Sequence, residues 1–327
     1  MSAWWACDEA ARHGDGGGMI YTITLNPTLD ITYTLDCFEF GESVKAKDVQ
    51  KSPGGKGINV SRALRSMGVE SVAMGLIGGY SGEEVIHLLQ QEGLILQIVR
   101  IKNETRTNVI VIGEQDGKEL VIRAAGPVVE QTETECITNI FFRVANRPEV
   151  LVLSGSLPKG VRKDIYYSII KEGRSRGTKV VLDAGGEPFK LGIEAGPYLI
   201  KPNLEELEEL AGRELTSDGA VIEYCRELLR KEISIIAVSL HGQGALLVTS
   251  NEVYKGNVPK IEGDTVGAGD SMVAGLVIGI TESKNLEESF RMGLACGVSA
   301  VANQGPGLCE PEYYDRMLPR VEVERLE

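Results

Sequence analysis

The sequence predicts an α/β fold in which a doubly wound, mostly parallel sheet is flanked by helices and carries a small antiparallel β lid. Three observations support this class. Short apolar runs alternate with helical runs along most of the 327 residues, which is typical of parallel sheets. Two segments break that alternation with short β-type runs that do not fit a strand–helix–strand series. A glycine-rich turn leads directly into an apolar helix near the C-terminus.

The alternating runs place strands and helices in order along the chain. Strands are expected at residues 20–25, 71–77, 149–153, 179–182, 198–200 and 234–240. The first helix carries an apolar stripe of Val60, Ala63, Leu64 and Met67 and ends at Gly68. Further helices are expected at residues 163–174, 204–210, 220–229 and 271–280.

Residues 31–50 and 96–125 are the two segments that break the alternation. The second contains two β-type runs, residues 108–113 and 119–123, around the turn Gln115-Asp116-Gly117. We expect both segments to form antiparallel strands of a lid that projects from the main domain. Residues 19–327 are therefore predicted to form one domain with a discontinuous lid.

The first 18 residues differ in composition from the rest of the chain. They contain both tryptophans, Trp4 and Trp5, and end in three glycines before Met19. A secretory signal would need a basic start and an apolar stretch, and neither is found here. We expect residues 1–18 to be a disordered extension or a tag remnant and the fold to begin at Met19.

Composition excludes several classes of function. A net charge of −13 opposes non-specific nucleic-acid binding, which needs a basic surface. The six cysteines lack the close paired spacing of a zinc site, and their number is ordinary for a reduced intracellular protein. No apolar run approaches the roughly 20 residues that cross a bilayer. A cytoplasmic protein with neither nucleic acid nor membrane as a partner is expected.

The turn at residues 264–270, Asp-Thr-Val-Gly-Ala-Gly-Asp, predicts an anion site beside a carboxylate. Gly267 and Gly269 let backbone N–H groups point at one anion, and the following helix adds its positive end. Asp270 would then lie where a base could take a proton from an attacking hydroxyl. The alternative is a plain turn with aspartate as a helix cap. The glycine spacing of this turn does not fit a dinucleotide fingerprint, and the Gly55-Lys56 pair, followed by Gly57, does not fit a Walker A loop.

Two earlier segments suggest a polyol site. At residues 53–59, the amides of Gly54 and Gly55 could approach sugar hydroxyls, Lys56 could meet an anion, and Asn59 could both donate and accept hydrogen bonds. Asp30 follows the first strand, at the sheet edge where ligands bind in open α/β folds. A helix-entry loop and a turn aspartate are the alternatives.

These three segments, in this order and at this spacing, resemble the PfkB-type sugar kinases of the ribokinase-like family, over residues 19 to about 311. The stretches Thr24-Leu25-Asn26-Pro27, Gly54-Gly55-Lys56-Gly57-Ile58-Asn59-Val60 and Thr105-Arg106-Thr107-Asn108 are most similar to its phosphosugar branch. That branch contains the 1-phosphofructokinases and tagatose-6-phosphate kinases. The loop Gly41-Glu42-Ser43-Val44-Lys45 departs from the branch by lacking an Asn-Arg pair, which leaves the sugar open.

The resemblance implies a role for each motif on the acceptor side. Asp270 would be the catalytic base, and the amides of Gly267, Ala268 and Gly269 would form the anion hole. Sugar hydroxyls would be held by Asp30, Gly54, Gly55 and Asn59. The existing phosphate would be bound by Lys56 and Arg106, with Lys45 on the lid assisting. A structural salt bridge is the alternative role for Arg106.

The nucleotide side is implied by two further motifs. Lys201-Pro202-Asn203 with Glu206 resembles the Asn-x-x-Glu element, in which Asn203 lies near the ATP phosphates and Glu206 organises Mg2+ through water. Glu206 could instead belong to an acidic helix face. Ser239, Gly242 and Gly244 would receive the nucleotide, with His241 a bystander and adenine near residues 296–305. Asp264 and Thr265 could bind a monovalent cation.

The resemblance implies an ATP-dependent kinase that converts a ketohexose monophosphate to a bisphosphate, with fructose 1-phosphate as the favoured acceptor. Tagatose 6-phosphate and fructose 6-phosphate are alternative acceptors, and a non-catalytic sugar-phosphate sensor is an alternative of another class. Pairing of two lids would make a homodimer.

Overall fold

The computed structural model describes residues 19–39, 41, 43–115, 117–143, 148–261, 263, 265–303 and 307–327. The expectations for residues 1–18, for Asp264 and for Asp116 in the lid turn lie outside these described residues. No helix in the described ranges is long and apolar enough to cross a membrane.

The main body is built on a ten-stranded sheet with the order β14-β13-β12-β11-β10-β9-β8-β1-β4-β5. The strands from β11 to β5 pair in parallel, and β12, β13 and β14 add antiparallel strands at one edge. The bounds are β1 Ile20–Thr24, β4 Ser71–Ile77, β5 Ile95–Arg100, β8 Val150–Ser154, β9 Lys179–Asp183, β10 Leu199–Ile200, β11 Ile235–Ser239, β12 Ala245–Val248, β13 Val253–Asn257 and β14 Glu322–Arg325. The mostly parallel sheet expected from the sequence is confirmed.

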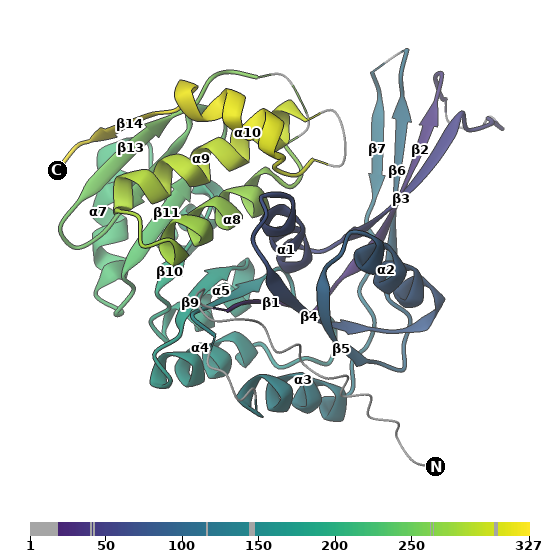
Figure 1. Ribbon diagram of the computed structural model, residues 1–327, viewed down its shortest axis with the longest axis horizontal. Helices are drawn as coiled ribbons and strands as arrows, with labels where there is room; N and C mark the ends of the chain where they lie inside the picture. The colour runs from purple at the N-terminus through teal and green to yellow at the C-terminus, as the bar shows by residue number, and fades with distance from the viewer. Residues whose placement is uncertain are drawn as a thin grey trace.

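Helices cover both faces of this sheet (Figure 1). One face packs against α3 Gln131–Arg143, α4 Ile165–Ser175, α5 Gly186–Ile193, α6 Leu204–Ala211 and α7 Asp218–Leu229. The other face packs against α1 Lys56–Ser66, α8 Ala268–Thr281, α9 Leu286–Ala302 and α10 Pro311–Met317. Two short 3-10 turns, η1 His241–Gln243 and η2 Leu318–Arg320, are also present. The doubly wound prediction is therefore confirmed.

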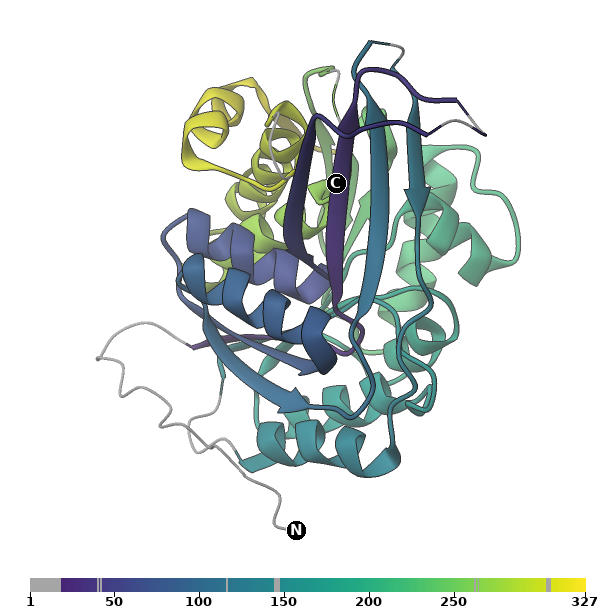
Figure 2. The ribbon, with the colours of Figure 1, turned by 90° about the vertical axis from the view of Figure 1, so that its right-hand side faces the viewer.

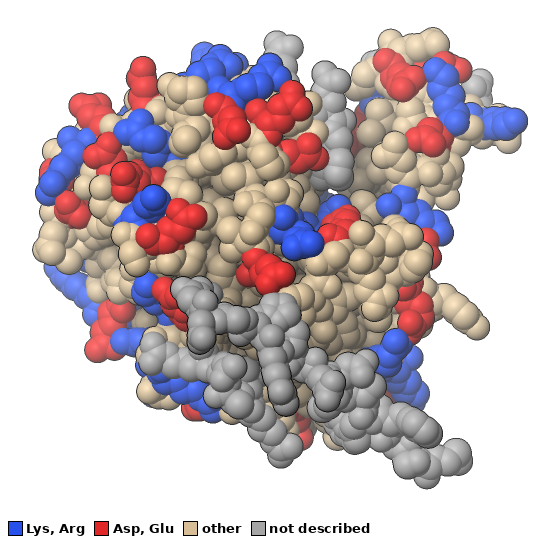
Figure 3. All heavy atoms as spheres, viewed as in Figure 1, with Lys and Arg blue, Asp and Glu red and all other residues tan. Residues whose placement is uncertain are grey.

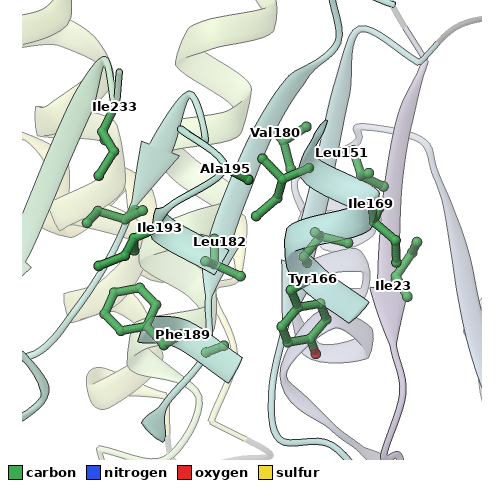
Figure 4. Close-up of a cluster of buried hydrophobic side chains, with 14 of the residues drawn as sticks. Ile23, Leu151, Tyr166, Ile169, Val180, Leu182, Phe189, Ile193, Ala195 and Ile233 are labelled. Carbon is green, nitrogen blue, oxygen red and sulfur yellow. The ribbon is translucent and has the colours of Figure 1, made fainter. Parts of the chain in front are cut away.

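Strand alternation decides which side chains enter which layer. In β1, Tyr21 and Ile23 contribute to the core on the α4 side, while Ile20 packs on the α8 side. Figure 4 shows Ile23 in the first core beside Tyr166 and Ile169 of α4, with Phe189 of α5 at the other side of the same cluster. Each fully buried large apolar side chain contributes roughly 1.5–3 kcal/mol, so this two-sided burial fixes the position of β1 and the loop after it.

Helix α8 is buried almost all round, because α9 covers it on the outside. Residues 270–280 of α8 are all buried. Gly275 and Gly279 let the backbone of α9 approach closely, since a methyl group at either position would overlap α9 atoms. This packing fixes the N-terminal end of α8, which carries Asp270.

A second, four-stranded sheet projects from the body, as Figures 1 and 2 show. Its order is β3-β2-β6-β7, with β2 Thr28–Leu35, β3 Asp48–Gly54, β6 Arg106–Gly113 and β7 Glu119–Ile122. Its base packs against α2 Gly79–Gln91 through a third apolar cluster that includes Leu29, Val85 and Leu89.

This small sheet differs from the expected lid in two respects. The outer pairs are antiparallel as expected, but the central pair, β2 and β6, is parallel. The chain between them passes through β3, α1, β4, α2 and β5, a crossover long enough for parallel pairing. Residues 96–100, expected in the lid, belong instead to β5 of the large sheet, because α2 returns the chain to pair alongside β4.

Candidate active site

A large cavity lies between the small sheet and the carboxyl edge of the main sheet. Its volume is about 1600 Å³, above the roughly 300–1000 Å³ typical of a pocket for one small ligand. Both glycine-rich loops line it, together with the inward face of β2 and β6. In Figure 3 the space between body and small sheet is open, and acidic and basic side chains are mixed over the face shown. The cavity is large enough for two ligands.

The parallel sheet directs three chain segments into this cavity. Asn26 follows β1, Asp183 ends β9 and Lys201 follows β10. Because the carboxyl ends of parallel strands meet at one edge, residues distant in sequence converge there.

The turn before α8 has the geometry expected of an anion site. Gly267 is the N-cap with φ 82°, and a methyl group there would overlap the Gly307 carbonyl oxygen. The amide of Ala268 donates to the Thr265 carbonyl at 3.2 Å, so an anion would replace that bond or bind neighbouring amides. Gly269 leaves room for Lys201, whose Nζ would lie 3.4 Å from a methyl group at this position. A cation therefore reinforces the positive end of the helix.

Asp270 is buried in the first turn of α8, with only 6% of its surface exposed. Its Oδ2 accepts a hydrogen bond from Asn59 Nδ2 at 2.8 Å. Burial, followed by the negative charge of Asp183, raises the pKa of Asp270 to about 7, against the opposing effects of Lys56, Asn59 and Lys201. A carboxylate with this pKa is a competent base near neutral pH. Asn59, expected at the sugar hydroxyls, directly contacts this base.

Lys56 lies at the first position of α1 and contacts a carboxylate that sequence reasoning missed. Its Nζ donates to Asp183 Oδ1 at 3.0 Å, and Lys201 Nζ lies 3.7 Å from the same oxygen. Asp183 is fully buried. Although burial raises the pKa of Asp183, the charges of Lys201 and Lys56 bring it below the usual value. Lys56 was expected at the acceptor phosphate, and the structure places its ammonium beside Asp183 and near Asp270.

Asp30 occupies the base of the small sheet, facing the cavity. Its Oδ1 accepts hydrogen bonds from Asn108 Nδ2 at 2.8 Å and from Thr28 Oγ1 at 3.2 Å. Burial raises the pKa of Asp30, while these two hydrogen bonds lower it. A glycine is needed at position 54, which faces Asp30, because a methyl group there would overlap the Asp30 carboxylate. Gly55, the N-cap of α1, has φ 120° and also lines the cavity.

Arg106 begins β6 and is half-buried at the same end of the cavity. One of its terminal nitrogens donates to the Asn26 carbonyl at 3.2 Å, while Nε is buried without a partner. No salt bridge of Arg106 is found among the described residues, and its role stays a prediction. Lys45 is exposed and is not one of the described residues that line the cavity.

The nucleotide motifs line the opposite end. Asn203 and Glu206 form a capping box on α6: the Glu206 amide donates to Asn203 Oδ1 at 2.7 Å, and the Asn203 amide donates to Glu206 Oε2 at 3.0 Å. Ser239 pairs with Asn203 in an isolated bridge. The described residues contain no cluster of three or more His, Cys, Asp or Glu side chains that could hold a metal.

The turn after β11 has the small residues that the nucleotide assignment requires. Gly244 has φ 88°, and a methyl group there would overlap the Gly256 carbonyl. A methyl group on Gly242 would meet open space. His241 lines the cavity, and its Nε2 lies 2.7 Å from Glu205 Oε1; its bystander role stays a prediction. Gly297, Val298 and Val301 add a largely apolar wall.

Sequence reasoning missed Asp183 and Asn108 as members of the site. Asp183 directly follows an expected strand, so its place at a carboxyl strand end could have identified it. Asn108 lies two residues after Arg106 on an expected β run, and period-two alternation puts both on one face.

Comparison with known proteins agrees with this geometry. Residues 23–313 match the model of the pfkB family carbohydrate kinases. The 1-phosphofructokinase of Bacillus subtilis is 37% identical over 309 residues, covering 94% of this chain and 100% of that protein. The tagatose-6-phosphate kinase of Staphylococcus epidermidis is 32% identical, covering 93% of this chain and 99% of that protein.

Solved structures give the same result. Phosphofructokinase-2 from Escherichia coli in complex with potassium has a TM-score of 0.88 at 32% identity, covering 92% of this chain and 98% of that one. A possible 1-phosphofructokinase from Thermotoga maritima has a TM-score of 0.86 at 28% identity, covering 94% and 100%. With matched residues spanning nearly the whole fold, including both glycine loops and Asp270, the chain belongs to the pfkB family of carbohydrate kinases.

Proposed function

We propose that this protein transfers the γ-phosphoryl group of ATP to a hydroxyl of a ketohexose monophosphate, with fructose 1-phosphate as the principal acceptor and fructose 1,6-bisphosphate as product. The observation that carries the proposal is Asp270: a buried carboxylate with a raised pKa at the positive end of α8. The curated relatives at 37% and 35% identity are 1-phosphofructokinases, which favours this acceptor.

In the proposed reaction, Asp270 takes the proton of the acceptor hydroxyl as that oxygen attacks the γ-phosphorus, and the bond from the γ-phosphorus to the β,γ-bridging oxygen of ATP breaks, so that ADP leaves. Asn59 holds the carboxylate in place through its 2.8 Å hydrogen bond. The amides at Gly267, Ala268 and Gly269, with the ammonium of Lys201, stabilise the charge on the transferring group.

Acceptor binding follows from the polar face of the small sheet. Asp30, oriented by Asn108, would accept hydrogen bonds from sugar hydroxyls. Arg106 offers its unpartnered Nε and a planar fork to the existing phosphate, and Arg123 lines the same cavity. Closing of the small sheet as a lid would exclude water from the reacting phosphate.

Magnesium would be held on the nucleotide side by Glu206 and Asn203. Glu206 Oε2 is engaged in the capping box, while Oε1 lies 3.2 Å from where a methyl group on Gly185 would be and has no hydrogen bond among the described residues. A single carboxylate fits a magnesium ion that keeps most of its water, which agrees with the lack of a multi-ligand cluster among the described residues. When bound with ATP, the ion neutralises charge on the phosphates.

Three further parts of the proposal concern partners, cations and location. On the face of the small sheet turned away from the cavity, Val49 and Ile122 are 48% and 53% exposed, and this apolar surface would pair two copies in a homodimer. Light scattering of Ile122→Asp, which should be monomeric where the wild type is dimeric, tests this.

Thr265 is exposed beside the α8 turn, where a monovalent cation would bind, and replacing K+ by Na+ in the assay should change turnover. A cytoplasmic location rests on the six cysteines, whose number and spacing are ordinary for a reduced intracellular protein.

The decisive experiment is an ADP-release assay with magnesium and a panel of fructose 1-phosphate, fructose 6-phosphate, tagatose 6-phosphate and free sugars. The highest kcat/KM is expected for fructose 1-phosphate, and Asp270→Asn should abolish turnover while retaining ligand binding. Preference for another phosphosugar would reassign the acceptor within the family. Calorimetric binding without ADP formation by the wild type would favour a sensor and refute the kinase proposal.

A further inference from the structure

Asp183 is a buried carboxylate that lies close to two lysine ammonium groups. It ends β9 and is fully buried. Its Oδ1 accepts from Lys56 Nζ at 3.0 Å and lies 3.7 Å from Lys201 Nζ, while Oδ2 has no hydrogen-bond partner among the described residues. A buried carboxylate is tolerated only where opposite charge compensates for lost hydration. One aspartate therefore serves as counter-ion to two lysines.

The two lysines come from different sides of the cavity. Lys56 belongs to the acceptor loop and begins α1, and its side chain is 41% exposed. Lys201 follows β10 on the nucleotide side, is 5% exposed and lies beside Gly269 of α8. Asp183 is thus the one described carboxylate paired with a cation from each side.

We propose that Asp183 is a positioning residue: it holds Lys56 and Lys201 beside the start of α8 and so prevents both ammonium groups from pairing with the base Asp270. Asp183 itself contacts no substrate in this scheme, which rests on the proposed function. Its role is exerted through the two lysines and through its own charge.

The charges around Asp270 explain why such a residue is needed. The groups that act on it are Asp183, Lys56 and Lys201, with Asn59 as the neutral donor, and Glu206 acts in turn on Lys56. Without Asp183, Asp270 would be the remaining buried carboxylate near both lysines. A carboxylate paired with ammonium groups binds a proton more weakly and is a poorer base.

The test is Asp183→Asn, compared with the wild type and with Asp164→Asn as a matched change at an exposed aspartate. The kcat/KM of the wild type should rise with pH through about 7, following ionisation of Asp270. In Asp183→Asn, the midpoint of this rise should move down by at least about one pH unit, and kcat should fall at least tenfold by rough estimate. A lower kcat with an unmoved midpoint would indicate a merely structural role and overturn the proposal.

A second measurement separates this proposal from the proposed function. Carbon NMR of aspartate-labelled protein, with the Asp270 signal assigned by its loss in Asp270→Asn, reports the pKa of Asp270 without any turnover. The Asp270 midpoint should be lower in Asp183→Asn than in the wild type, whichever phosphosugar is accepted. Equal midpoints would refute the role of Asp183 even if the kinase activity is confirmed.

A double variant covers the case in which Asp183→Asn does not fold, since that change leaves two ammonium groups without their counter-ion. Asp183→Asn with Lys201→Met removes one of them and should recover a folded circular-dichroism spectrum. Lys56 would then pair with Asp270, and the NMR midpoint should still lie below that of the wild type. Lys201→Met alone removes a cation and should raise the midpoint. A double variant with the wild-type midpoint would contradict the proposal.

Discussion

Replacing Asp270 by asparagine should make the protein more stable at neutral pH while removing its activity. The wild-type carboxyl group is buried, and burial together with the charge of Asp183 raises its pKa from 3.8 to about 7. At neutral pH, folding therefore moves the negative charge of Asp270 from water into a buried site beside another negative charge, which costs free energy. Asparagine has nearly the same shape and can still accept the hydrogen bond from Asn59.

The size and sign of the effect follow from proton linkage. Because the folded pKa is raised, the folded state binds this proton more tightly than the unfolded chain, and stability is lost as pH rises from about 4 to about 7. A difference of about 3 pH units at about 1.4 kcal/mol each gives a cost on the order of 4 kcal/mol above pH 7. Below about pH 4 the cost disappears.

Denaturant unfolding of both proteins at about pH 5.5 and about pH 8 measures this difference. Between these pH values the advantage of Asp270→Asn in free energy of unfolding should grow by about 2 kcal/mol, since about 1.5 pH units of the shifted range lie between them. Asp164→Asn, at an exposed position, should show no such growth. An advantage of equal size at both pH values would refute the reasoning, because the gain would then not come from the buried charge.

Three further predictions test the two ends of the cavity. Arg106→Ala should raise the KM for phosphosugars at least tenfold by rough estimate and leave the KM for ATP nearly unchanged; equal changes in both steady-state constants would contradict the acceptor-phosphate role. Gly267→Ala should lower kcat and reduce thermal stability by roughly 1–3 kcal/mol, because alanine is strained at φ 82° and overlaps the Gly307 carbonyl; a wild-type melting temperature would disprove this. Glu206→Gln should raise the magnesium concentration needed for half-maximal rate with little change in stability, since glutamine can still complete the capping box; an unaltered magnesium titration would exclude the metal role.

The sequence was informative where a local pattern determines local structure. Apolar runs predicted the strands of the parallel sheet, and the spacing of Gly267 and Gly269 predicted the turn before α8, because both depend on neighbouring residues alone. Residues 96–100 were assigned to the lid because period-two alternation reveals a strand without revealing which sheet it joins. The parallel pairing of β2 with β6 was missed for the same reason.

At the candidate site, contacts between residues far apart in sequence limit what can be predicted from the sequence. Asn59, predicted at the sugar hydroxyls, lines the cavity, but its hydrogen bond to Asp270 joins positions 211 residues apart. The pairing of Lys56 with Asp183 spans 127 residues. Lys56 in a glycine loop indicates a cation near an anion, but only the order of β1, β8 and β9 in the sheet determines which anion it meets.

The candidate site is organised for binding at the expense of stability. The buried side-chain atoms without a partner, among the described residues, are Thr24 Oγ1, Asn26 Oδ1, Arg106 Nε and Asp183 Oδ2. Three of these side chains line the cavity, and Asp183 contacts it through Lys56. Unsatisfied polar groups each cost roughly 1–3 kcal/mol, and they are concentrated where sugar hydroxyls and phosphates would supply the missing partners. The raised pKa of Asp270 follows the same logic, because the burial that destabilises its charge also makes it a base. Stability recovered on binding the phosphosugar and catalytic competence therefore have one structural origin.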